Sequence, residues 1–422
     1  MATRLGDPSE AVELLHDGEP VIARRGESLA LSLIAADRLL LSRSPKLHRA
    51  RGPYCLRGAC EGCLVRIDGL PNQPACRTIV QGGEVVETQN VLGSRETDLL
   101  SAADFLFPQG IDHHRLMAGV RGLSPLVANF ARRVAGLGKL ADRAPAPQPA
   151  ERRDLPVLIV GGGRKGLALA AQLGPLATLV DDGPELGGSL LALDPPRAKA
   201  LAAHARSAGA TVLEQHSVVA LSREPDDASG RLSALVIGPE RTWVMRAQCV
   251  VLASGKHDAV PAFPNNELPG IFSARAALLA WRSDVLIGSR IALVGSGRYT
   301  EVLLQQMSGV VELVALDEAS VVRAIGRDRV TGVEVRSDDK TRRLKVNALV
   351  FDGRGAPSFE LAVQAGASVD FEPSTGYSPR ADAEGRVADR VFVPHADPRV
   401  SATAVRASLP GGGGTRRPPQ PR

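Results

Sequence analysis

The sequence predicts a multi-domain protein that combines an α+β region with a longer α/β region. At 422 residues and 44% apolar content, the chain is long enough for roughly three globular domains. From Leu155 onward, short runs rich in Val, Ile and Leu alternate with helical or loop segments, which is the pattern of buried parallel strands. The 43 glycines, 30 prolines and 3% aromatic residues are typical of many turns between such elements.

The charge and cysteine content exclude several classes of protein. A net charge of +5, from 51 basic and 46 acidic residues without a dense basic stripe, indicates no nucleic-acid partner. The N-terminus has no apolar leader and no run of 18 apolar residues occurs, so we expect no membrane segment. Five cysteines are too few for a disulfide framework, which indicates a cytoplasmic protein with free thiols.

Residues 1–97 are expected to form a compact α+β domain. Two Asp-Gly turns, in VELLHDGEPVIA and CLVRIDGLPNQPACRTIV, join β-type runs and predict two hairpins. Between them lie the helix-like ESLALSLIAAD and a loop that contains three cysteines. This order of elements predicts a compact α+β unit, which we interpret, together with the cysteine spacing described next, as a ferredoxin-like domain of the β-grasp type.

The cysteine loop has the spacing of iron–sulfur ligands. Four cysteines follow the pattern C-x4-C-x2-C-x12-C, namely Cys55, Cys60, Cys63 and Cys76. This is the plant-type ferredoxin arrangement for a 2Fe-2S cluster. Small residues between the ligands, Gly58, Ala59 and Gly62, let backbone N–H groups approach the cluster. A structural zinc site and a set of merely buried cysteines are the alternatives, but zinc sites usually have two C-x2-C pairs. Cys249, in an apolar run, is expected to be a buried residue without a role.

Two low-complexity segments divide and end the chain. Residues 98–153 are predicted to be a helical connector that ends in a Pro-rich linker, ADRAPAPQPAERRD. His113 and His114, in this connector, are adjacent and would face different sides of a helix, so we interpret them as solvated. Residues 401–422 end in LPGGGGTRRPPQPR and are predicted to be a disordered tail, in which Arg416 and Arg417 are solubilising.

A first dinucleotide-binding motif begins at VLIVGGGRKGLALAA. A β-run leads into Gly161, Gly163 and Gly166 and then into a helix, which is the context that gives this motif its meaning. About 20 residues on, Asp181 or Asp182 is placed to bind a ribose hydroxyl, and the sequence does not choose between them. Arg164 and Lys165 stand where small residues are usual, either as phosphate ligands or as signs of a drifted site.

A second motif of the same kind lies in RIALVGSGRYTEVLLQQM. It contains Gly295 and Gly297, but Thr300 replaces the expected third small residue. Asp317 follows the next strand and would favour NAD over NADP, because an acid binds the ribose hydroxyls. The alternative is a domain that keeps its fold without a nucleotide.

The chain resembles the alpha subunit of heterotetrameric sarcosine oxidase and its relatives in cyanide-forming glycine dehydrogenase and opine oxidase systems. The segments that carry the resemblance include CLRGACEGCLVRIDG, PACRTIVQGGEVVETQN, VLIVGGGRKG, VDDGPELGGSL and ASGKHDAVPAFPNNELPGIFSARAA, between about residues 11 and 372. It implies a 2Fe-2S cluster on the four cysteines and a flavoprotein fold with two dinucleotide-binding, Rossmann-like domains.

The resemblance also implies domain limits and further site residues. An FAD domain would comprise residues 154–283 and 351–400, with Ser254 and Gly255 as additional FAD contacts. A NAD-binding-like domain would be inserted at residues 284–350. Two departures stand out: no folate-handling domain follows, so we expect no one-carbon transfer, and Asp397 alone matches the Gly-Asp pair that closes such FAD sites.

Three functions remain open at this point. The first is an electron-transfer subunit whose partner, an amine oxidase-type flavoprotein, oxidises a small amine or amino acid. The second is a self-contained NADH-dependent reductase, and the third is a non-catalytic assembly subunit with lost nucleotide sites. No catalytic residue can be assigned, and no C-x2-C lies in the flavin region, which excludes thioredoxin-reductase chemistry.

Overall fold

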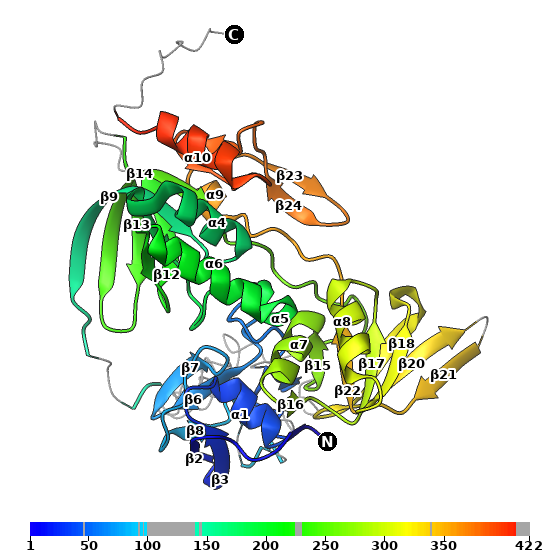
Figure 1. The fold of residues 1–422 in the computed structure, drawn as a ribbon. Helices are drawn as coiled ribbons and strands as arrows, with labels where there is room; N and C mark the ends of the chain where they lie inside the picture. The colour runs from blue at the N-terminus through cyan, green and yellow to red at the C-terminus, as the bar shows by residue number, and fades with distance from the viewer. Residues whose placement is uncertain are drawn as a thin grey trace, which may run out of the picture. The chain divides into compact units, whose positions relative to one another are not determined.

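The computed structural model describes residues 1–44, 47–91, 93–95, 97–98, 140–142, 146–223, 230–337 and 340–410 (Figure 1). The chain forms two compact units, and each is made of two separate segments. Unit 1 comprises Met1–Pro145 and Asp258–Gly353, and unit 2 comprises Ala146–His257 and Arg354–Arg422. Most of the expected connector, with His113 and His114, and the end of the tail, with Arg416 and Arg417, lie outside the described residues.

The described residues in the first segment of unit 1 contain a five-stranded sheet, in the strand order β3-β2-β8-β6-β7, and the helix α1. Both predicted hairpins are present, and their Asp-Gly turns have positive φ at both residues, as tight hairpin turns require. Ser28 caps the helix by accepting a hydrogen bond from the Leu31 N–H. The elements are β1 (Thr3–Arg4), β2 (Ala11–His16), β3 (Glu19–Arg24), α1 (Leu29–Ala35), β4 (Ser42–Arg43), β5 (Ala50–Arg51), β6 (Leu64–Ile67), β7 (Leu70–Pro74) and β8 (Val85–Glu87).

The second segment of unit 1 contains a parallel sheet in the order β15-β22-β17-β18 and an antiparallel sheet β19-β20-β21. The parallel sheet is made of β15 (Ile271–Ser273), β17 (Arg290–Val294), β18 (Glu312–Leu316) and β22 (Ala348–Phe351). The other elements are α7 (Ala274–Arg282), β16 (Val285–Leu286), α8 (Arg298–Met307), β19 (Val321–Gly326), β20 (Val330–Ser337) and β21 (Lys340–Leu344).

The inserted domain is larger than the expected range 284–350. β15 pairs in parallel with β22, so the chain from Asp258 to Arg282 belongs to this domain and not to the FAD domain. The sequence could not show this pairing because the two strands lie far apart along the chain.

Unit 2 is built on a sheet in the order β11-β10-β9-β14-β13-β12, to which β26 is added beside β14 and β25 beside β26. The strands are β9 (Ala150–Val160), β10 (Ala177–Val180), β11 (Thr211–Leu213), β12 (Ser217–Arg223), β13 (Leu232–Ile237), β14 (Thr242–Leu252), β25 (Arg386–Ala388) and β26 (Val391–Phe392). The remaining elements are α4 (Arg164–Leu173), α5 (Leu190–Leu193), α6 (Pro195–Ser207), α9 (Glu360–Gln364), the hairpin β23 (Val369–Glu372) and β24 (Gly376–Pro379), and α10 (Pro398–Ala407).

Two apolar clusters cover unit 2's sheet. Leu167 and Leu173 of α4, Ala202 of α6 and Val405 of α10 share one cluster with sheet residues such as Ile159. Two expected boundaries are therefore wrong: β9 starts inside the expected linker, at Ala150, and residues 401–407 are helical instead of disordered. The apolar residues of α10 stabilise the helix because they pack in the core of unit 2.

Within the described ranges, every helix is too short or too polar to cross a lipid bilayer.

Candidate functional site

The four clustered thiols lie in two pairs. Cys55 is hydrogen-bonded to Cys60, and Cys63 is hydrogen-bonded to Cys76. No group of three or more His, Cys, Asp or Glu side chains within the described ranges gathers around one metal position. A cluster with two iron ions needs two thiolates for each iron, and the two pairs fit this arrangement. Tetrahedral zinc instead needs four ligands around a single ion.

The backbone around the thiols points its N–H groups at sulfur. The Gly58 N–H donates to Cys76 Sγ at 3.0 Å, and the N–H groups of Arg57 and Ala59 donate to Cys55 Sγ at 3.4 Å each. Gly58 has a φ of +80°, a conformation that favours glycine. These donors stabilise negative charge on sulfur, so the residues fit a thiolate-bound cluster.

The ionisation of the thiols follows the same pairing. The hydrogen bond from Cys55 lowers the pKa of Cys60 to about 7, and the one from Cys76 lowers the pKa of Cys63. The same hydrogen bonds, with burial, raise the pKa of the two donor thiols. In contrast, burial raises the pKa of Cys249 to about 12, against the opposing charges of Arg386 and Arg390, in agreement with a residue that only packs.

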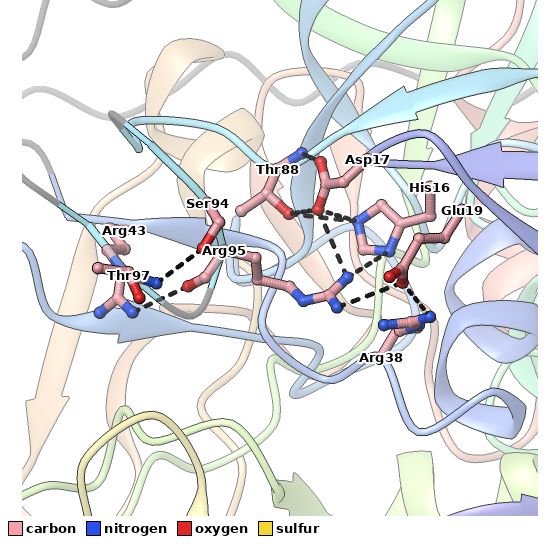
Figure 2. A network of polar contacts seen from close by, with 9 residues as sticks. All are labelled: His16, Asp17, Glu19, Arg38, Arg43, Thr88, Ser94, Arg95 and Thr97. Atoms are coloured by element: carbon pink, nitrogen blue, oxygen red, sulfur yellow. Dashed lines mark hydrogen bonds and ion pairs between the residues drawn. The ribbon is translucent and has the colours of Figure 1, made fainter.

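A partly buried polar network lies where β2 and β8 of the same domain end (Figure 2). Thr88 Oγ1 donates to Asp17 Oδ2 at 2.7 Å and lies 3.2 Å from His16 Nε2. Arg95 Nη1 lies 3.4 Å from both His16 Nδ1 and Asp17 Oδ2. Burial lowers the pKa of His16 to about 4, and the neighbouring Arg95 adds to this against the opposing charge of Asp17. His16 is therefore neutral at pH 7.

The first glycine loop, between β9 and α4, has the geometry of a phosphate-binding turn. Gly161 has a φ of +108°, and an added Cβ would lie 2.4 Å from the Ala253 carbonyl oxygen. A Cβ on Gly166 would lie 2.0 Å from the Gly161 carbonyl oxygen, so both glycines are required by the fold. At Gly163, the nearest atom to an added Cβ is Gly188 Cα at 4.0 Å. The fold itself does not require glycine at 163, whereas an approaching pyrophosphate does.

The start of α4 completes this loop. Gly163 occupies the N-cap position of α4 and, as a glycine, has no side chain that could cap the helix. Arg164 and Lys165 are exposed in the first turn, and Lys165 Nζ donates to the Pro394 carbonyl oxygen at 3.1 Å. A helix N-terminus with cations beside it favours a bound phosphate.

Asp181 is the better candidate for the ribose ligand. Its Oδ2 accepts a hydrogen bond from the Gly162 N–H at 2.5 Å, and its Oδ1 accepts one from the Gly183 N–H at 2.9 Å. These bonds fix the carboxylate against the glycine loop, whereas Asp182 is exposed. Asp181 as the ribose ligand stays a prediction, which these backbone contacts favour.

The other expected FAD contacts divide into two groups. Ser254 and Gly255 follow β14 and lie beside the first loop, because a Cβ on Gly161 would be 3.0 Å from the Ser254 nitrogen. Asp397 instead caps α10 and pairs with Arg399 at 2.8 Å. These bonds lower the pKa of Asp397 to about 2. The fit of the loop residues to FAD is good, and Asp397 has a structural partner of its own.

The second glycine loop, between β17 and α8, is filled by a side chain. Asp352 Oδ2 accepts a hydrogen bond from the Thr300 N–H at 2.8 Å. A Cβ added to Gly297 would lie 2.6 Å from this oxygen. Asp317, the expected ribose ligand, is exposed and accepts a hydrogen bond from the Ala319 N–H at 3.1 Å. The carboxylate stands where a nucleotide phosphate would approach, so Gly295, Gly297 and Asp317 do not fit NAD binding in this chain.

Sequence reasoning missed Asp352. The sequence shows an acidic residue directly after a buried β-run, in ALVFDG. The pattern could not tell which strand lies beside that run in the sheet, and so could not place Asp352 at the second glycine loop.

Comparisons with known proteins agree with this geometry. A family model described as a 2Fe-2S iron–sulfur cluster binding domain matches residues 9–91. The sarcosine oxidase subunit alpha of Rhizobium meliloti (strain 1021) is 27% identical over 415 residues, which cover 86% of this chain and 41% of that subunit. The hydrogen cyanide synthase subunit HcnA of Pseudomonas aeruginosa is 40% identical over 83 residues, which cover 19% of this chain and 79% of HcnA.

A solved structure shows the fold of nearly the whole chain. The crystal structure of L-proline dehydrogenase from P. horikoshii has 20% sequence identity and a TM-score of 0.70, and the match covers 96% of this chain and 72% of that one. The thiol loop and these comparisons thus define a protein with a 2Fe-2S cluster binding domain and the fold of that dehydrogenase. The chain belongs to the family of iron–sulfur subunits that includes the sarcosine oxidase alpha subunits and HcnA. It spans 41% of the length of the Rhizobium meliloti subunit and 33% of that from Corynebacterium sp. (strain P-1).

Proposed function

We propose that this chain is the iron–sulfur and FAD-carrying electron-transfer subunit of a complex that oxidises a small amine or amino acid. The observation that supports it best is the presence of two carrier sites in one chain: four thiols paired two by two, and a glycine loop whose Gly163 is open. When bound, a flavin exchanges electrons in pairs or singly and a 2Fe-2S cluster moves them singly, so together they link a two-electron donor to a one-electron path.

The residues of the chain serve these carriers in distinct ways. The N–H groups of Arg57, Gly58 and Ala59 donate to thiolate sulfur. The first turn of α4 and Lys165 provide positive potential for a pyrophosphate, and Asp181 accepts hydrogen bonds from the ribose hydroxyls.

A partner subunit supplies the oxidation of the substrate in this proposal. Two relatives are named as subunits, sarcosine oxidase subunit alpha and hydrogen cyanide synthase subunit HcnA, and a structural relative is named as an L-proline dehydrogenase. From these names we infer a hetero-oligomer with a flavoprotein of the amine oxidase type. A cytoplasmic location belongs to the same proposal, since all five cysteines are free.

The first test is the composition of the chain purified alone under anaerobic conditions. We expect about two irons and two sulfides per chain for a 2Fe-2S cluster, with non-covalent FAD in the same sample. Cys60→Ser should abolish the visible absorbance of the cluster, and Cys249→Ser is the matched control that should keep it. Iron and sulfide without flavin, even after reconstitution, would favour an assembly subunit instead.

The second test is activity with a partner. Co-expression with an adjacent oxidase-like gene should give one complex on size exclusion, in which an amine or amino acid reduces the cluster. If the single chain oxidised NADH at an ordinary enzymatic rate of about 1 to 1000 per second, a self-contained reductase would replace this proposal.

A further inference from the structure

We infer that the second glycine loop has lost its nucleotide to the side chain of Asp352, and that the inserted domain now serves as a support for the cysteine loop. This inference concerns unit 1 alone and does not depend on which partner or substrate the chain has. It rests on the position of one carboxylate and on the contacts between the two segments of unit 1.

The sheet topology brings Asp352 to the loop. β22 lies beside β17 in the parallel sheet, so the residue after β22 meets the loop after β17. The Asp352 N–H donates to the Val294 carbonyl oxygen at 2.9 Å, and this fixes its backbone. The carbonyl oxygen of Asp352 lies 2.6 Å from the position of a Cβ on Gly295, and its carboxylate covers Gly297.

The carboxylate occupies the position that an anion would take. The first N–H groups of α8, a ten-residue helix, have no acceptor within the helix and carry a partial positive charge. Asp352 accepts from one of them, Thr300, at 2.8 Å. A pyrophosphate would have to displace this carboxylate and would be repelled by its negative charge, because the two anions compete for the same donors.

The inserted domain holds the cysteine loop by backbone and side-chain contacts. The Ser273 N–H donates to the Tyr54 carbonyl oxygen at 3.0 Å, directly before Cys55. The Tyr54 hydroxyl donates to the Ala259 carbonyl oxygen. Gly52 lies so close to Pro269 that an added Cβ would be 3.0 Å from the Pro269 Cβ.

Ion pairs add to this attachment. Asp37, at the end of the helical segment in the cysteine domain, accepts two hydrogen bonds from Arg329, at 2.7 and 3.0 Å. Arg43 Nη2 donates to Asp328 at 2.7 Å. Bidentate Arg–carboxylate contacts fix geometry as well as charge. The inserted domain therefore stabilises the position of the cysteine loop.

Nucleotide titration of the holo chain tests the first half of the inference. Isothermal titration with NADH and with ADP-ribose should show no binding to the native chain up to millimolar concentration. Asp352→Ala, which leaves the backbone in place, should bind ADP-ribose at least tenfold more tightly. Asp352→Asn keeps the acceptor and the volume but removes the charge, so its affinity should lie between the two.

Two results would overturn the assignment of Asp352. One is micromolar binding by the native chain that Gly297→Val abolishes. The other is a folded Asp352→Ala chain that binds no better than the native one. Adding Asp317→Asn to Asp352→Ala should remove the gained binding and thereby locate the nucleotide on this loop.

Thermal loss of cluster absorbance tests the second half. Arg329→Met should lower the temperature at which the visible absorbance disappears by several degrees. Arg323→Met is the matched control, since Arg323 pairs at 2.8 Å with Glu334 inside the antiparallel sheet. Equal temperatures for the native chain and Arg329→Met, or an equal loss in the control, would refute the supporting role.

Discussion

The two glycine loops of this chain have the same backbone arrangement but different residues after the strand beside each loop. Each follows a parallel strand, starts with a glycine of positive φ and leads into a ten-residue helix, α4 or α8. Beside the first loop, Ala253 follows β14, and beside the second, Asp352 follows β22. Their N–H groups donate to the equivalent carbonyl oxygens of Val160 and Val294, at 2.7 and 2.9 Å. The two positions are therefore structurally equivalent.

This difference shows what a glycine motif reports. The G-x-G pattern reports a tight turn and a close backbone approach, both of which the two loops have. Whether a phosphate can enter is decided by the residue that follows the neighbouring strand. A methyl group at 253 leaves the space above Gly163 open, and a carboxylate at 352 fills the space above Gly297.

The largest effect should come from placing the carboxylate of the second loop in the first. In Ala253→Asp, the new carboxylate should reach the N-terminus of α4 and compete with the FAD pyrophosphate. We expect flavin affinity to fall at least a hundredfold, measured by flavin content after purification and by fluorescence titration. Ala253→Ser is the neutral control and should keep its flavin. Normal FAD content in Ala253→Asp would show that positions 253 and 352 do not have equivalent effects on the two loops.

The cysteine spacing and the first glycine motif could be predicted from sequence because each is local. Cys55, Cys60 and Cys63 lie on one short loop, and Gly161 to Gly166 span one turn. The choice of Asp181 over Asp182 needed the hydrogen bonds of a folded backbone. The resemblance to a known family, more than composition, led to the flavoprotein fold.

The parts that failed depend on contacts between distant segments. The inserted domain starts at Asp258 because β15 pairs with β22, and no local pattern reports such a pairing. Asp352 belongs to one strand and acts on a loop after another. The helix α10 was hidden because its apolar residues alternate with polar ones in a segment that ends in a glycine-rich tail.

Acid should lower the stability of unit 1, which contains the second glycine loop, by protonating His16. Its pKa is lowered from 6.5 to about 4, so the unfolded chain takes up a proton at a higher pH than the folded chain. Stability should therefore be lost as the pH falls from 6.5 to 4, by at most about 3.5 kcal/mol at ~1.4 kcal/mol per pH unit. Urea unfolding at pH 7.5 and 5.5, followed by cluster absorbance, measures this loss.

The control for the acid effect is His16→Gln, which cannot be protonated in this range. Its unfolding free energy should change less between these two pH values than that of the native chain, because glutamine takes up no proton. Both proteins carry the same cluster, so the cluster contributes equally to the two measurements. An identical pH dependence in the two proteins would show that another group is responsible.

A smaller effect should separate the second glycines of the two loops. Gly297→Ala places a methyl group 2.6 Å from the Asp352 carboxylate, which must move away from the Thr300 N–H. We expect a loss of about 1–3 kcal/mol in the free energy of unfolding. In the flavin-free chain, Gly163→Ala meets nothing closer than 4.0 Å and should change stability by less than ~0.5 kcal/mol. Equal losses in urea unfolding would mean that the two loops are equally filled.

The smallest effect concerns the cation that only the first loop has. Both helices begin with an arginine, but Lys165 follows in α4 and Tyr299 in α8. Lys165 Nζ donates to the Pro394 carbonyl oxygen, so it lies near the start of α4 and adds positive potential there. Lys165→Met should weaken FAD binding by less than tenfold and reduce its dependence on salt, because an exposed charge is screened. FAD titrations at low and high salt test this, with Lys199→Met on α6 as the control. If Lys165→Met bound FAD with unchanged affinity at low salt, the first loop would attract its phosphate by the helix N-terminus alone.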